Sequence, residues 1–85
     1  SCGSVFKNPE GHKVAQLIDQ CGLKGFTIGD AQVSNKHANF IVNLKKASAT
    51  DTWNLILYVK KTVKEKTNVD IHTEVIRLGE WDDVS

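Results

Sequence analysis

The sequence lacks several features that mark a broad protein class. It has no methionine, two cysteines and a single proline in 85 residues. Two cysteines are too few for the disulfide framework of a small secreted domain. Cys2, His12, Cys21 and His37 do not have the C-x-x-C spacing that is typical of a zinc site. We therefore expect two reduced thiols and no bound metal.

Charge and apolar runs are also modest. The formal net charge is +1, with one arginine, so no overall field attracts nucleic acid or an anionic membrane. Four lysines that lie close together could contact phosphates, but Glu65 lies among them and a solvated helix face explains them better. These lysines are Lys60, Lys61, Lys64 and Lys66. No apolar run approaches the ~18 residues that span a bilayer. No signal peptide is visible. We expect a cytoplasmic protein without a nucleic-acid or membrane partner.

The length predicts one small domain over residues 1–85. Such a domain is too small to enclose a flavin or a nicotinamide, so a redox cofactor would have to be bound elsewhere. The chain starts Ser1-Cys2-Gly3 and has no methionine. We expect it to be an excised or processed part of a longer protein.

Apolar spacing predicts two helices. The first runs from about His12 to Cys21, because its apolar residues recur at i, i+3, i+4 and i+7, and Gly22 ends it. The second is predicted to begin with Thr50 as its N-cap and to stop near Asn68. Its apolar residues are Trp53, Ile56, Val59 and Val63, with Leu55 beside them.

The remaining segments are predicted to be extended. Within residues 26–44, Phe40, Val42 and Leu44 alternate with other residues, as in a strand, and residues 34–37 form the turn of a hairpin. Residues 69–72 and 75–78 follow as extended segments, and Gly79 closes the last. The order of elements predicts an α+β fold, a small β-sheet with two helices packed on one face.

The first segment of the chain has two interpretations. Gly3 and Pro9 bound a short run that carries Ser4, Lys7 and Asn8. These polar side chains on a rigid run could line a pocket. The same residues could equally form a capped turn that leads into the first helix.

Glu74 also has two interpretations. It begins an extended segment, and a carboxylate at the end of a strand can hydrogen-bond a substrate or move a proton. A solvated charge at a sheet edge, which discourages aggregation, is the alternative.

Six sequence blocks, in one order and spacing, resemble the last domain of the UDP-N-acetylenolpyruvoylglucosamine reductases, also called UDP-N-acetylmuramate dehydrogenases. The resemblance runs from Cys2 to about Gly79. The blocks are G-S-V-F-K-N-P from Gly3, L-I-D-Q from Leu17, G-L-K-G from Gly22, A-Q-V-S from Ala31, K-H-A-N-F from Lys36, and E-V from Glu74.

The resemblance implies a function that the residues alone do not. Family enzymes use NADPH to reduce bound FAD, and then reduce UDP-N-acetylglucosamine enolpyruvate to UDP-N-acetylmuramate for peptidoglycan. It implies that Ser4 is the proton donor and that Glu74 stabilises or protonates the enol intermediate. It implies that Asn8 and His37 bind the substrate. The FAD-binding domains would precede this chain, which we expect to be inactive alone.

Three positions depart from the family pattern. Asp30 stands where a second glycine is usual, Arg77 lies one residue later than the usual cation, and Thr67 replaces a usual aromatic residue. A shift of one residue turns a strand side chain to the other face. The alternative function is therefore a small α+β domain that binds a ligand without catalysis, or a degenerate homologue.

Overall fold

The computed structural model describes residues 4–74, 76–77 and 83–84 and has the predicted α+β class. The elements are β1 (Phe6–Lys7), α1 (Val14–Gln20), β2 (Thr27–Ile28), β3 (Ala31–Val33), β4 (Ile41–Asn43), α2 (Ala49–Thr67), β5 (His72–Thr73), β6 (Ile76–Arg77) and β7 (Asp83–Val84). The sequence-based expectations for Cys2, Gly3, Val75, Leu78 and Gly79 lie outside the described residues.

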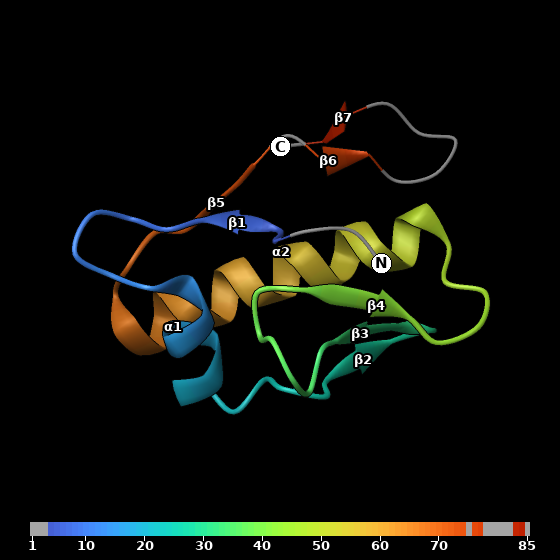
Figure 1. Cartoon of the computed structure of the whole chain (residues 1–85), viewed down its shortest axis with the longest axis horizontal. Coiled ribbons are helices and arrows are strands. Elements are labelled where there is room, and N and C mark those ends of the chain that lie inside the picture. The colour runs from blue at the N-terminus through green and yellow to red at the C-terminus, as the bar shows by residue number, and fades with distance from the viewer. Residues whose placement is uncertain (1–3, 75, 78–82, 85) are drawn as a thin grey trace.

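The strands are divided among three small antiparallel sheets, β1–β5, β2–β3–β4 and β6–β7. In Figure 1, α2 runs along the length of the molecule, with β1 and β5 above it and the three-stranded sheet below. α2 packs against β2 and β3, and α1 packs against α2. The order of elements does not reveal that β1 pairs with β5, because both helices and the three-stranded sheet lie between these two strands in the sequence.

One hydrophobic core joins the helices and strands. Its largest fully buried side chains are aliphatic and come from α1, α2, β3 and the residue before β5. They are Val14, Ile18, Val33, Leu55, Ile56, Val59, Val63 and Ile71. Burying each such side chain contributes about 1.5–3 kcal/mol, so this cluster is the main source of stability in a small domain.

β4 buries a different face from the one that the sequence pattern suggests. Ile41 is 9% exposed, whereas Leu44 is 49% exposed. The cause is the register, which sets Ile41 directly opposite the buried Val33. Residues opposite each other lie on the same face of a sheet, so Ile41 faces the core.

The ends of the helices follow the sequence with two corrections, of which the first is that α1 begins at Val14 and not at about His12. Gly22, at φ +73°, follows the last turn of α1 as predicted. The N-cap of α2 is Ser48 and not Thr50, because the Ser48 hydroxyl accepts a hydrogen bond from the Asp51 N–H at 2.9 Å. Thr50 lies inside the first turn, so the helix begins at Ala49.

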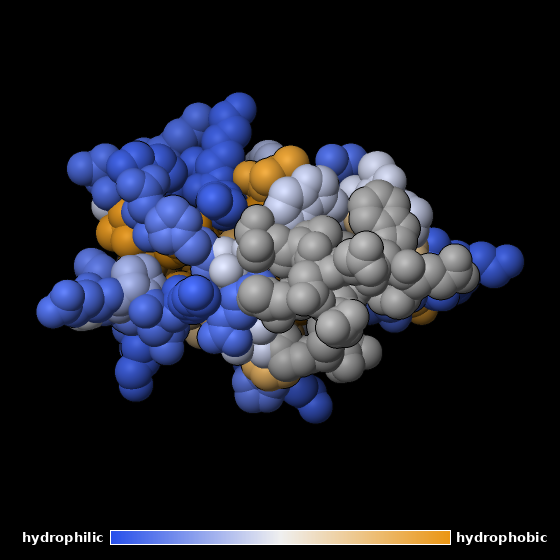
Figure 2. Space-filling view, turned by 90° about the horizontal axis from the view of Figure 1, so that it is seen from above, coloured by the Kyte–Doolittle hydropathy of each residue, from blue (hydrophilic) through white to orange (hydrophobic). Residues whose placement is uncertain are grey.

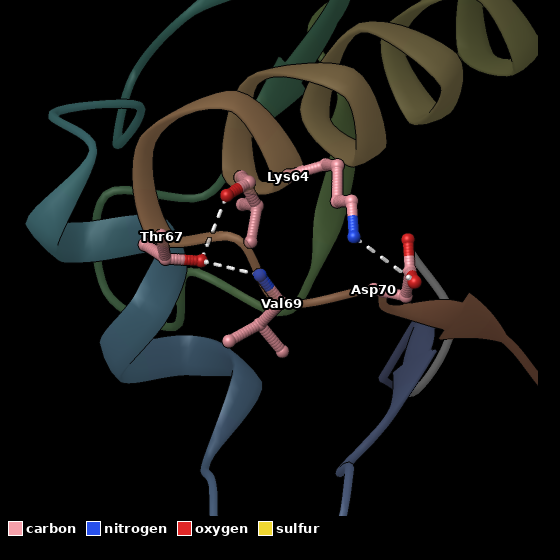
Figure 3. A network of polar contacts seen from close by, with 5 residues as sticks. Lys64, Thr67, Val69 and Asp70 are labelled. Atoms are coloured by element: carbon pink, nitrogen blue, oxygen red, sulfur yellow. Dashed lines mark hydrogen bonds and ion pairs between the residues drawn. The ribbon is translucent and has the colours of Figure 1, made fainter.

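The predicted stop of α2 at Asn68 is confirmed, and Figure 3 shows the polar contacts around it. Asn68 has a left-handed φ of 62° and its N–H bonds to the Lys64 carbonyl at 2.9 Å. The Thr67 hydroxyl donates to the Val63 carbonyl at 2.7 Å and accepts from the Val69 N–H at 3.3 Å. The Thr67 hydroxyl therefore links the end of α2 to the segment that leads into β5.

The turn between β2 and β3 accommodates Asp30 without strain. Gly29 has φ +57°, whereas Asp30 does not have a positive φ. This matches a two-residue hairpin turn that needs glycine only at its first central position. The Asp30 carboxylate accepts from the Lys46 N–H at 3.1 Å, and the Asp30 carbonyl accepts from the Leu44 N–H at 2.8 Å. The departure from the family pattern is thus compatible with the fold.

Candidate functional site

A groove of about 410 Å³ brings together all four residues that the sequence singled out. Ser4, Asn8, His37 and Glu74 line it, together with Phe6 of β1. They come from the start of the chain, the loop between β3 and β4, and the position after β5. Figure 2 views the molecule from the side of β1 and β5, and hydrophilic side chains gather over the end that carries α1.

Backbone hydrogen bonds fix the Ser4 segment against Glu74. The Glu74 N–H donates to the Val5 carbonyl at 2.9 Å. This bond continues the β1–β5 ladder, in which Phe6 lies opposite Thr73. Ser4 is half-buried and Glu74 is exposed. A hydroxyl and a carboxylate are therefore supplied to one groove by two adjacent backbone segments.

Asn8 also binds the start of α1, although the N-cap position of this helix is Lys13. Its side-chain oxygen accepts a hydrogen bond from the Val14 N–H at 2.9 Å. The capped-turn interpretation is therefore confirmed for Asn8, and it does not exclude the pocket. The bond fixes the side-chain amide, and within the described part of the chain its nitrogen has no protein partner. Asn8 can present an N–H donor to a ligand in the groove.

The His37 loop is held by its own hydrogen bonds. The Ser34 hydroxyl accepts from the N–H groups of Lys36 and His37, each at 3.1 Å. The Ser34 N–H bonds to the Phe40 carbonyl at 2.9 Å and closes the loop. The His37 ring lies 5.4 Å from the Phe40 ring, tilted by 48°. These contacts leave His37 exposed while limiting the positions of its ring.

The groove has more cationic than anionic side chains. Lys13, Lys24 and Lys36 line it, against Asp19 and Glu74. Lys24 and Asp19 form an exposed ion pair at 3.8 Å, which contributes little to stability. The excess of lysines favours an anionic ligand, because ammonium groups are common partners of phosphate and carboxylate.

Sequence reasoning missed Asn39 and the three lysines as part of this site. Asn39 stands in one of the quoted blocks, and its side chain bonds the backbone of Phe6. The sequence signal for it is weak, because the partner lies 33 residues away. The lysines are distributed over the chain, and only the fold gathers them.

The lysines of α2 and Cys21 lie apart from the groove. Lys64 pairs with Asp70 at 3.3 Å (Figure 3), and Lys60 is partly buried. Cys21 is buried in the core after α1. In residues 4–74, 76–77 and 83–84, no cluster of three potential metal ligands is found. No helix among the described residues is long and apolar enough to cross a membrane.

Residues 1–78 match the family model described as UDP-N-acetylenolpyruvoylglucosamine reductase, C-terminal domain. The chain belongs to this family. The match covers most of the sequence, including all four candidate residues, so the resemblance seen in six short blocks extends through the intervening segments. The chain is thus part of an oxidoreductase family.

Reductases of this family from other bacteria align with nearly the whole of this chain. It is 60% identical to the UDP-N-acetylenolpyruvoylglucosamine reductase of Listeria monocytogenes over 94% of this chain and 27% of that protein. It is 56% identical to the reductase of Synechococcus elongatus over 99% of this chain and 28% of that protein. The chain therefore spans roughly a quarter of the length of these relatives.

A solved structure is similar to this chain in both fold and sequence. The crystal structure of the reductase from Thermus caldophilus matches with a TM-score of 0.64 and 43% identity. It covers 85% of this chain and 26% of that chain. The arrangement of helices and strands described above is thus that of one part of a larger reductase.

Proposed function

We propose that this chain is the substrate-binding domain of an NADPH- and FAD-dependent reductase, with UDP-N-acetylglucosamine enolpyruvate as substrate and UDP-N-acetylmuramate as product. The observation that carries the proposal is the convergence of Ser4, Asn8, His37 and Glu74 on one groove. The family match supports the same assignment. Peptidoglycan synthesis is then the process served. A cytoplasmic location is part of the proposal, because NADPH and a UDP-sugar are both found there.

The groove suits a substrate of this chemistry. A diphosphate and a carboxylate make the substrate anionic, and Lys13, Lys24 and Lys36 supply opposite charge. Asn8 donates its side-chain N–H to the substrate, and the exposed His37 provides a second polar contact. The groove is open and not an enclosed cavity, which fits half of a site whose other half is a second domain of the same protein.

In the proposed mechanism this chain handles the proton. Reduced FAD, which the other domains would hold, would supply a hydride to the methylene carbon of the enolpyruvyl group. The electron pair of the C=C bond then moves to the carbon beside the carboxylate, which becomes strongly basic. Ser4 donates its hydroxyl proton to that carbon and regains one from water. A weak acid suffices here because its position does much of the work.

Glu74 lies on the same groove as Ser4 and acts on the same intermediate. To stabilise an anionic intermediate, Glu74 would have to be protonated or paired with a cation from another domain. Residues 1–85 on their own are expected to lack reductase activity, because the hydride donor is held elsewhere.

The test is NADPH oxidation by the full-length protein that carries this domain. With UDP-N-acetylglucosamine enolpyruvate, oxidation is expected to be rapid and to yield one UDP-N-acetylmuramate for each NADPH. The matched control is UDP-N-acetylglucosamine, which lacks the enolpyruvyl group and should support no oxidation. Equal, slow oxidation with both compounds would remove the reductase assignment.

A further inference from the structure

We propose that Asn39 is a positioning residue that holds the Ser4 segment in register with Glu74. This inference rests on the proposed function for its consequence in catalysis, but its structural part stands separately. Asn39 is two residues after His37 in the loop between β3 and β4, and it also lines the groove.

The Asn39 amide fills both hydrogen-bonding positions of one backbone residue. Its side-chain oxygen accepts from the Phe6 N–H at 2.9 Å, and its side-chain nitrogen donates to the Phe6 carbonyl at 2.9 Å. Its own carbonyl accepts from the Val5 N–H at 2.8 Å. One residue therefore replaces a neighbouring strand along this edge of β1.

The other edge of β1 is bound by β5. Phe6 lies opposite Thr73, and the Glu74 N–H reaches the Val5 carbonyl at 2.9 Å. The Phe6 side chain is 2% exposed, and the polar groups of its backbone are those that Asn39 satisfies. Without Asn39 these groups lose their partners at a buried position, which favours a shift of the short strand.

Such a shift would move Ser4 and Asn8 relative to Glu74. Ser4 is two positions before Phe6 and Asn8 is two positions after it, whereas Glu74 directly follows β5. A strand of only two residues has few ladder bonds with which to keep its place. A displacement of about 1 Å at a reacting group can cost on the order of 100-fold in rate. The side-chain oxygen and one side-chain N–H of Asn39 are used on Phe6, so we assign it a positioning role.

The test compares Asn39→Ala with Asn43→Ala in the full-length protein. Asn43 is a matched control, because its side-chain oxygen also accepts one loop hydrogen bond, from the Ala47 N–H at 3.0 Å, and it does not line the groove. We expect Asn39→Ala to lower kcat by about 10- to 100-fold and to raise KM by a smaller factor, since Asn8 moves with the same segment. Asn43→Ala should keep the wild-type kcat at a temperature where both variants are folded. Equal kcat values for the two variants, or a change in KM alone, would overturn the inference.

Amide hydrogen exchange provides a readout that does not depend on the reaction. Peptides that contain residues 5–8 should exchange faster in Asn39→Ala than in wild type, and at the wild-type rate in Asn43→Ala. Unchanged exchange in both would overturn the inference even if the enzyme is active. An inactive wild type with faster exchange in Asn39→Ala would refute the proposed function but would support the role of Asn39 in holding β1. If Asn39→Ala does not fold, Asn39→Asp keeps the acceptor, lacks the donor, and should show the same pattern.

Discussion

The side-chain oxygen of Asn8 accepts a hydrogen bond from the Val14 N–H at 2.9 Å, and the same side chain lines the groove that contains Ser4 and Glu74. The amide oxygen of Asn8 thus has a structural role, whereas its amide nitrogen is available to a ligand. The two halves can be separated by substitution, because aspartate retains the acceptor and removes the donor.

Asn8→Asp is expected to fold as well as wild type and to bind substrate poorly. The retained oxygen still binds the start of α1, so the free energy of unfolding should change by less than about 0.5 kcal/mol. The lost N–H and the added negative charge should weaken the binding of the anionic substrate by roughly tenfold or more. Calorimetric titration and thermal unfolding measure the two effects.

Asn8→Ala is the companion variant. It removes the acceptor as well, so it should lose about 1 kcal/mol of stability in addition to affinity. Wild-type affinity in Asn8→Asp would show that the amide nitrogen does not contact the substrate.

Gly29→Ala should be destabilising. Gly29 has φ +57°, and a β-carbon at this position would also require the carboxylate of Asp51, at the start of α2, to turn aside. Left-handed strain alone costs about 1–3 kcal/mol in a residue other than glycine. Chemical denaturation should show a loss of at least that size. Gly11→Ala is the control, since it has a similar φ of +80° and open space around it, and should lose less.

Ser48→Ala should destabilise the protein by about 1 kcal/mol, because it removes the N-cap of α2. Thr50→Ala should have almost no effect, since Thr50 is an exposed residue of the first turn. Thermal unfolding of the two variants decides between these caps. A larger loss in Thr50→Ala would contradict the observed start of the helix.

The helices could be predicted from the sequence because their signals are local. The apolar spacing of α2 and its stop at Asn68 can each be recognised within a few neighbouring residues, and the structure confirms both. The start of α2 was misplaced by two residues, since Ser48 and Thr50 are both good caps and only the hydrogen bond to Asp51 distinguishes them. The buried face of β4 was missed for a different reason, because the pairing of Ile41 with Val33 is not local.

The candidate site could be predicted only by resemblance. Neither spacing nor composition distinguishes Ser4 and Glu74 from a turn residue and an edge charge. Their meeting on one groove depends on the pairing of β1 with β5, across about 65 residues of chain. Asn39 was missed because its role lies in a contact with the backbone of Phe6, which leaves no motif of its own.

The central claim is that Ser4 supplies a proton to the substrate, and a full-length Ser4→Ala variant tests it most directly. The variant keeps the fold-determining contacts of Val5 and Phe6, so substrate affinity and reduction of the enzyme by NADPH should stay close to wild type. Substrate-dependent turnover should fall by about 10²- to 10⁴-fold, as expected for loss of a general acid. Ser48→Ala, remote from the groove, should keep its turnover at a temperature where it is folded. Wild-type turnover in Ser4→Ala would contradict the account.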